Sequence, residues 1–163
     1  MEFTEYMARG RPALTRFAMV LTCQGWLAED VVSNVLCRAY EQWERISRMS
    51  EPHAYVRRMV VNEYLSWRRQ LKRTSPRAEI EPRGLDDGAD QRAERDAMIE
   101  RLASLPRKQR AAVVLRYYVG LTDAEIAVEL SCRVSTVRSQ ISRALATLRI
   151  DLTTDPRTLQ ETK

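Results

Sequence analysis

The sequence predicts an all-α protein in which an acidic, flexible linker joins two small helical domains, the second of them a helix-turn-helix. Ala, Leu, Arg and Glu dominate its 163 residues, and these residue types favour helices. Apolar side chains recur at three- and four-residue steps on both sides of a segment rich in Pro, Gly and Asp. With only 5 Gly and 6 Pro, the chain is neither collagen-like nor of low complexity.

Composition also argues against several functional classes. The three cysteines, Cys23, Cys37 and Cys132, are too few and too widely spaced for a disulfide framework or a zinc cluster. His53 is the single histidine, and no paired acids or phosphate-binding loop are present, so we expect no enzyme activity, no metal and no cofactor. No apolar run of about 18 residues predicts membrane insertion, and the first residues lack the pattern of a secretory signal. We therefore expect a cytoplasmic protein.

Residues 1–73 form the expected N-terminal domain, in which three helices follow from the spacing of apolar residues. The first is predicted at about 3–23 and the second at about 28–46. The third is predicted at about 51–71, directly after Ser50, whose hydroxyl makes it a suitable N-cap. Each helix has one apolar stripe that should face a common core.

The outer face of the third predicted helix combines cations, an amide and aromatic rings. Residues 55–73 hold 6 basic side chains and 1 acidic one. Cations neutralise phosphates and aromatic rings stack on unpaired bases, so one interpretation is a site for single-stranded nucleic acid. The other is a solvated basic face whose aromatics belong to the core. The predicted outer residues are Arg57, Arg58, Asn62, Tyr64, Ser66, Trp67, Arg68, Arg69, Lys72 and Arg73.

A linker is predicted at residues 74–91. Pro76 ends the preceding helix, because proline lacks an amide donor and restricts the residue before it. Residues 74–100 hold 4 basic and 8 acidic side chains, whereas the blocks 1–73 and 104–149 are both basic. Two basic blocks can bind a polyanion such as DNA at two places, and the acidic linker between them would avoid it.

The C-terminal domain is expected at residues 92–151, followed by a tail at 152–163. Thr122 and Glu125 fit a capping box at the start of a short helix, and Ser135 caps a longer helix after a tight turn. This order predicts a helix-turn-helix, and the alternative is an ordinary helical hairpin. The outer face of the last helix carries small hydroxyls, an amide and arginines, which can contact base edges and phosphates. These residues are Thr136, Arg138, Ser139, Gln140 and Arg143.

Four stretches of the chain, taken together and in order, point to a known family. They are LTRFAMVLTCQ (14–24), LAEDVVSNVLCRAYEQW (27–43), PHAYVRRMVVNEYLSWRR (52–69) and LPRKQRAAVVLRYYVGLTDAEIAVELSCRVSTVRSQISRALATLR (105–149). The chain resembles the extracytoplasmic-function, or group 4, sigma factors of the sigma-70 family, in particular their sigma-E-like actinobacterial subfamily. Such proteins direct bacterial RNA polymerase to promoters.

The resemblance implies that the first domain is region 2 and the second is region 4. The helix at 28–43 would bind the coiled coil of the largest subunit of core RNA polymerase. The loop at 46–52 and the helix after it would capture a flipped base and melt the −10 element, and the last helix would read the −35 element. The implied polymerase contacts are Asp30, Ser33, Asn34 and Arg38. The implied −10 contacts are Ser50, Arg57, Arg58, Asn62, Trp67 and Arg68. The implied −35 contacts are Ser135, Thr136, Arg138, Ser139, Gln140 and Arg143.

The resemblance implies three departures from the family pattern, the first of which covers two neighbouring residues. Ser33 and Asn34 stand where Gln and an acid are common, Ser135 replaces a glycine, and Gln140 replaces an arginine. The last change bears on the preferred −35 sequence. The resemblance also implies promoter DNA, core RNA polymerase and a cognate anti-sigma factor as partners.

Two other functions remain as alternatives from the sequence. A stand-alone helix-turn-helix regulator would need a dimer interface, and it would leave the basic third helix and the acidic linker without a task. An adapter protein that has lost DNA binding would have no need of the arginines that both domains retain. Those residues are Arg57, Arg58, Arg68, Arg138 and Arg143.

Overall fold

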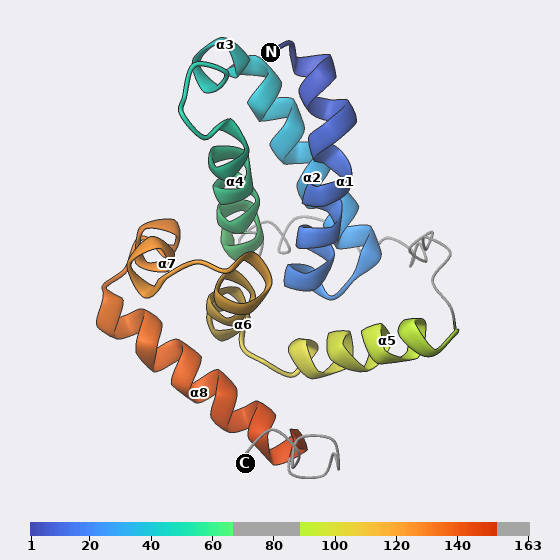
Figure 1. The fold of residues 1–163 in the computed structure, drawn as a ribbon, viewed down its shortest axis with the longest axis vertical. Helices are drawn as coiled ribbons and strands as arrows, with labels where there is room; N and C mark the ends of the chain where they lie inside the picture. Colours follow the sequence, from blue (N-terminus) through green and yellow to red (C-terminus); the bar gives the residue numbers. More distant parts are fainter. Residues whose placement is uncertain (67–88, 153–163) are drawn as a thin grey trace. The chain divides into compact units, whose positions relative to one another are not determined.

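The computed structural model describes residues 1–66 and 89–152, with side chains for 1–66 and 90–149 (Figure 1). Every regular element in these ranges is a helix, which confirms the predicted all-α fold. The chain divides into two compact units, with the boundary after Glu100. None of the helices in these ranges combines the length and apolar character that a membrane span needs.

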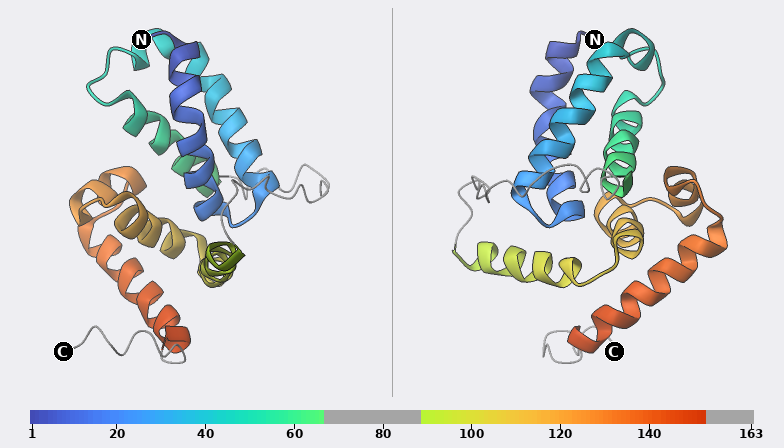
Figure 2. Two further views of the ribbon diagram at one scale, coloured as in Figure 1. Left: turned by 45° about the vertical axis from the view of Figure 1, so that its right-hand side comes forward. Right: turned by 180° about the vertical axis from the view of Figure 1, so that it is seen from behind.

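Three helices of the first unit pack against one another: α1 (Phe3–Thr22), α2 (Gly25–Glu41) and α4 (Pro52–Ser66), as Figures 1 and 2 show. The short α3 (Trp43–Ile46) lies between α2 and the loop that precedes α4. The three helices associate because each has a stripe of apolar residues that water disfavours. Fully buried members of this core come from all three: Leu14, Leu21, Val31, Val35, Val56 and Val60.

The two ends of α2 differ from the predicted bounds of about 28–46. The helix α1 ends at Thr22, close to its predicted end, Cys23 adopts the left-handed conformation (φ 56°), and α2 begins at Gly25 rather than at about 28. A non-glycine residue rarely takes that conformation, so the sequence does not show that the turn is complete within Cys23 and Gln24. The helix α2 stops before Gln42, and the break lets Trp43 turn inward, where its Nε1 donates to the carbonyl oxygen of Met1 at 3.0 Å.

An aromatic cluster joins the beginnings of α1 and α4. The ring of Tyr6 lies 4.7 Å from that of Trp43 between centroids, and Phe3 lies 5.2 Å from both Trp43 and Tyr40. The hydroxyl of Tyr6 lies 3.2 Å from Nδ1 of His53, within hydrogen-bond distance. Burial raises the pKa of Tyr6 to about 12. Tyr6 is thus a neutral phenol that can donate to an unprotonated imidazole nitrogen.

The second unit contains α6 (Arg107–Val113), η3 (Val114–Val119), α7 (Asp123–Leu130) and α8 (Val134–Leu152). The helix α5 (Ala89–Ala103) precedes them and crosses the boundary between the units. The helices α6 and α7 both pack on α8, and η3 packs on α6 and α7. Their core includes Leu105, Ala112, Leu115, Ile126, Val137 and Ala144, all buried.

Apolar spacing in this part of the chain predicts that Met98 and Tyr118 face inward, and both expectations are wrong. Met98 is 58% exposed, whereas Leu102 in the last turn of α5 is buried. Leu115 and Tyr118 would share one face of an α-helix, yet Leu115 is buried and Tyr118 is half exposed. The wider π-helical turn of η3 rotates Tyr118 away from that face, and Gly120 then ends the segment with φ 84°.

Candidate polymerase and nucleic-acid interfaces

Three of the four implied polymerase contacts share one exposed face of α2. Asp30, Ser33 and Asn34 follow the three- and four-residue steps that bring helix residues together, and all three are exposed. The valines on the opposite side of the same turns are buried in the core. Cys37, one further step along, is also exposed and belongs to the same face. We call Asp30, Ser33, Asn34 and Cys37 the α2 face.

The fourth implied contact, Arg38, forms an ion pair inside the first unit. Its guanidinium pairs with the carboxylate of Glu63 on α4. The side chain of Glu63 is 4% exposed and that of Arg38 is 48% exposed. The arginine therefore reaches from the surface to a buried carboxylate, and the pair links α2 to α4. Sequence reasoning missed Glu63, although its being the single acid among the basic residues 55–73 was a usable signal.

The residues implied in −10 recognition differ in their exposure, and two of them lie outside the described residues. Asn62 is exposed, whereas Arg57 and Arg58 are partly buried, and Ser50 is exposed in the loop before the helix. Trp67 and Arg68 lie outside the described residues. Among the other predicted outer positions, Arg69, Lys72 and Arg73 also lie outside them.

Tyr64 does not belong to the outer face as predicted. Its side chain is only 1% exposed, because it follows Val56 and Val60 at steps of four along the buried stripe of α4. The tyrosine that does approach the loop before α4 is Tyr55. Arg45 donates from Nη2 to the Tyr55 hydroxyl at 2.8 Å and lies over its ring, which ties α3 to α4 across the loop.

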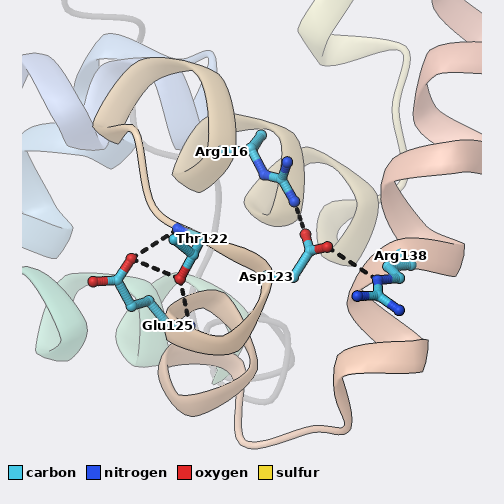
Figure 3. A network of polar contacts seen from close by, with 5 residues as sticks. All are labelled: Arg116, Thr122, Asp123, Glu125 and Arg138. Carbon is cyan, nitrogen blue, oxygen red and sulfur yellow. Dashed lines mark hydrogen bonds and ion pairs between the residues drawn. The ribbon is translucent and has the colours of Figure 1, made fainter.

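The helix-turn-helix begins with the predicted capping box, which the structure confirms. The Thr122 amide donates to the Glu125 carboxylate at 2.7 Å, and the Glu125 amide donates to Thr122 Oγ1 at 3.3 Å (Figure 3). Two backbone donors at the start of α7 are thereby satisfied. The turn after α7 begins at Ser131, in the left-handed conformation, and leads directly into α8.

The implied −35 residues lie along the side of α8 that the core leaves uncovered. Val137, Ile141 and Ala144 face the core, and Ser139 and Gln140 are partly buried beside them. The remaining four implied residues are exposed: Ser135, Thr136, Arg138 and Arg143. The face therefore presents hydroxyl, amide and guanidinium groups together, as a major-groove surface requires.

An aspartate that sequence reasoning missed joins three elements of this unit. Asp123, the first residue of α7, accepts a hydrogen bond from Nε of Arg138 on α8 at 3.1 Å. Its other carboxylate oxygen pairs with Arg116 of η3 (Figure 3). A hollow of about 380 Å³ lies beside these groups, and its cationic lining consists of Arg116, Arg138 and Arg149. Three arginines and one carboxylate thus line this hollow, and guanidinium groups are suited to phosphate oxygens.

Protein-family comparison assigns both parts of the chain. Residues 7–74 match the model of sigma-70 region 2, and residues 95–148 match that of sigma-70 region 4. The RNA polymerase sigma-E factor of Streptomyces coelicolor is 35% identical over 153 residues, covering 93% of this chain and 86% of the relative. The extracytoplasmic-function sigma factor SigL of Mycobacterium tuberculosis is 30% identical over 145 residues, covering 85% and 82%.

A solved structure agrees with these sequence relatives. The sigma factor RpoE of Bartonella quintana, in complex with the anti-sigma factor NepR, has a TM-score of 0.68 to this chain. It is 25% identical, and the match covers 94% of this chain and 98% of that one. The region 2 and region 4 matches and the relatives lead to one assignment: the chain belongs to the sigma-70 family, as an extracytoplasmic-function RNA polymerase sigma factor that directs promoter-specific transcription initiation.

Proposed function

We propose that this sigma factor uses three different surfaces to bind polymerase, to open the −10 element and to recognise the −35 element. The α2 face binds core RNA polymerase, the polar and cationic side of α4 with Ser50 opens the −10 element, and the outer side of α8 reads the −35 element. The single observation that carries the proposal is a pair of separate units, each presenting a basic helix whose opposite side is buried. Melting and duplex recognition need different geometries, and two units can supply both.

The −10 assignment follows from the energetics of strand opening. Flipping a base costs a few kcal/mol of stacking, which cations and aromatic stacking can offset. Arg57, Arg58 and Asn62 on α4 supply the cations and an amide, while Trp67 and Arg68 stay predictions from the sequence. The −35 assignment rests on α8, whose exposed hydroxyl and guanidinium groups fit base edges and phosphates.

Transcription in vitro tests the proposal directly. Core RNA polymerase with this chain should give run-off product from a matched promoter, and core polymerase alone should give none. Sequence-specific binding to DNA without core polymerase, and no product with it, would instead support a stand-alone regulator. Asp30→Arg reverses a charge on the α2 face, so it should lower product formation at limiting sigma factor and leave the fold intact.

Two further statements belong to the same proposal. We propose that the chain acts in the cytoplasm, where the polymerase is, and that the polymerase supplies all the chemistry. A cognate anti-sigma factor is proposed as a regulatory partner, because the RpoE relative was solved in complex with one. Co-purification of the full chain with a partner that blocks run-off transcription would support this.

A further inference from the structure

The contacts of Asp123 differ from those of the other acid at the start of α7. Glu125 closes the capping box locally with Thr122, whereas Asp123 reaches out of its helix to two arginines. The side chain of Asp123 is 22% exposed, between Arg116 at 33% and Arg138 at 71%. Each carboxylate oxygen therefore has its own cation, and the aspartate is held from both sides.

Arg138 meets this carboxylate with one nitrogen only. Its Nε donates to Asp123 Oδ2, and within the described residues Nη1 and Nη2 donate no hydrogen bond (Figure 3). Those two nitrogens form the edge that pairs bidentately with guanine O6 and N7 or with phosphate oxygens. The exposed position of Arg138 on α8 leaves this edge in water.

We propose that Asp123 is a positioning residue for −35 recognition: it holds the Arg138 guanidinium by Nε so that the Nη edge meets DNA already oriented. The inference rests on the proposed function of α8. An arginine free to sample its rotamers would lose that freedom only on binding, and a pre-oriented arginine has lost it beforehand. Arg116 also contributes, because its ion pair with Asp123 restricts the rotamers of the aspartate side chain.

The two properties of Asp123 act on DNA in opposite directions. Its negative charge repels phosphates and so weakens binding to every sequence, while its hold on Arg138 favours the sequence that Arg138 fits. Asp123→Asn should consequently raise non-specific binding and lower discrimination. A merely structural residue would reduce both together, so the ratio of specific to non-specific affinity separates the two roles.

The experiment uses holoenzyme assembled from core polymerase and the full chain, with matched and scrambled −35 duplexes competing for it. Asp123→Asn should lower the specific-to-non-specific ratio by about three- to tenfold, the effect expected from loosening one bidentate contact. Glu125→Gln is the matched control, since it removes the same charge from the same turn of α7 and leaves Arg138 held. We expect the control to leave the ratio within about twofold of wild type.

A double-mutant cycle decides whether Asp123 acts through Arg138. In an Arg138→Ala background, Asp123→Asn should cause no further loss of the ratio. An equal loss in both backgrounds would overturn the inference and leave the −35 assignment intact. If Arg138→Ala itself leaves the ratio unchanged, the assignment of Arg138 fails and the inference falls with it.

Folding is checked by circular dichroism for each variant. Where Asp123→Asn melts early, Asp123→Glu replaces it, because glutamate keeps the charge and displaces the carboxylate by one methylene. This variant should lower the ratio below that of the wild type, without the rise in non-specific binding. Wild-type discrimination by Asp123→Glu, with Asp123→Asn unfolded, would also overturn the inference.

Discussion

The two units both pair an acid with an arginine of another helix, yet they use the pair differently. In the first unit the acid, Glu63, lies on the proposed DNA-contacting helix α4 and is 4% exposed, with Arg38 reaching down to it from α2. In the second unit the acid, Asp123, lies on the supporting helix α7, and the arginine belongs to the proposed reading helix α8. Burial decides the role of each pair.

A buried carboxylate without its cation is costly, because neither water nor a partner then stabilises the charge. The Arg38–Glu63 pair should therefore set how firmly α4 is held. The Arg138–Asp123 pair is more exposed, so its net stabilisation is small and its geometry matters more. The comparison teaches that the first pair positions a helix and the second positions a side chain.

The largest expected effect is on the stability of the first unit. Arg38→Ala leaves Glu63 buried and uncompensated, and we expect a loss of about 2–3 kcal/mol, below the range for a fully buried pair because Arg38 is half exposed. Urea denaturation of the full chain, followed by tryptophan fluorescence, measures it, since Trp26, Trp43 and Trp67 all precede the linker.

Two further variants sharpen that measurement. Arg38→Ala combined with Glu63→Met removes the buried charge and leaves no buried polar group in its place, so it should recover most of the lost stability. Arg48→Ala breaks the Arg48–Glu44 pair, whose side chains are 75% and 85% exposed, and we expect a change below about 0.5 kcal/mol. Equal losses for Arg38→Ala and Arg48→Ala would show that the burial of Glu63 is not decisive.

The next effect separates opening from reading. Arg58→Ala on α4 should reduce the permanganate reactivity of unpaired thymines at the −10 element by about tenfold, the value of one charge-assisted hydrogen bond. Arg143→Ala on α8 should instead weaken closed-complex binding and reduce its salt slope by about one. The reverse pattern, with Arg143→Ala impairing only opening, would break the proposed division between the units.

A third prediction concerns base preference at α8. Gln140 and Arg143 are three residues apart and share a helical face, and Gln140 is partly buried beside the core. Glutamine pairs with adenine and arginine with guanine, so Gln140→Arg should shift the preference at one −35 position by about 1–3 kcal/mol. Transcription from a randomised −35 library measures this. Identical sequence preferences, with higher transcription from all promoters, would make Gln140 a phosphate contact.

Local chemistry explains which features could be predicted from the sequence. Apolar spacing located the helices, and the Thr122–Glu125 capping box needed only a stretch of four residues. The two acid–arginine pairs join residues 25 and 15 positions apart, so they depend on how helices pack. The π-helical turn that exposes Tyr118 likewise follows from packing, since no proline or glycine within the turn marks it.

The exposed side of α8 was predictable for a further physical reason. Its apolar residues, such as Val137 and Ile141, recur at one face, and the reading residues fall between them. The face of α4 was less predictable, because aromatic residues suit both a core and a base-stacking surface. Tyr64 belongs to the core, and only its four-residue step from Val60 distinguished it.

The smallest expected effect is a pH dependence confined to the first unit. Burial, and then the charge of Arg57, lower the pKa of His53 below its usual value of about 6.5. The unfolded chain therefore binds a proton at His53 at a higher pH than the folded chain does, so stability is present above about pH 6.5 and declines as the pH falls below it. Among the residues that the structure describes, Arg57 on α4 and the neutral Tyr6 of α1 are titratable groups that interact with the imidazole. Urea denaturation at several pH values between about 5 and 8, followed by tryptophan fluorescence, should show this dependence of stability on pH, and His53→Gln should flatten its slope.

Tyr6→Phe is the matched control, because it removes the hydrogen bond to His53 but not the titrating group, so it should lower stability and keep the slope. A slope that survives in His53→Gln would assign the pH dependence to the carboxylates of the unit instead.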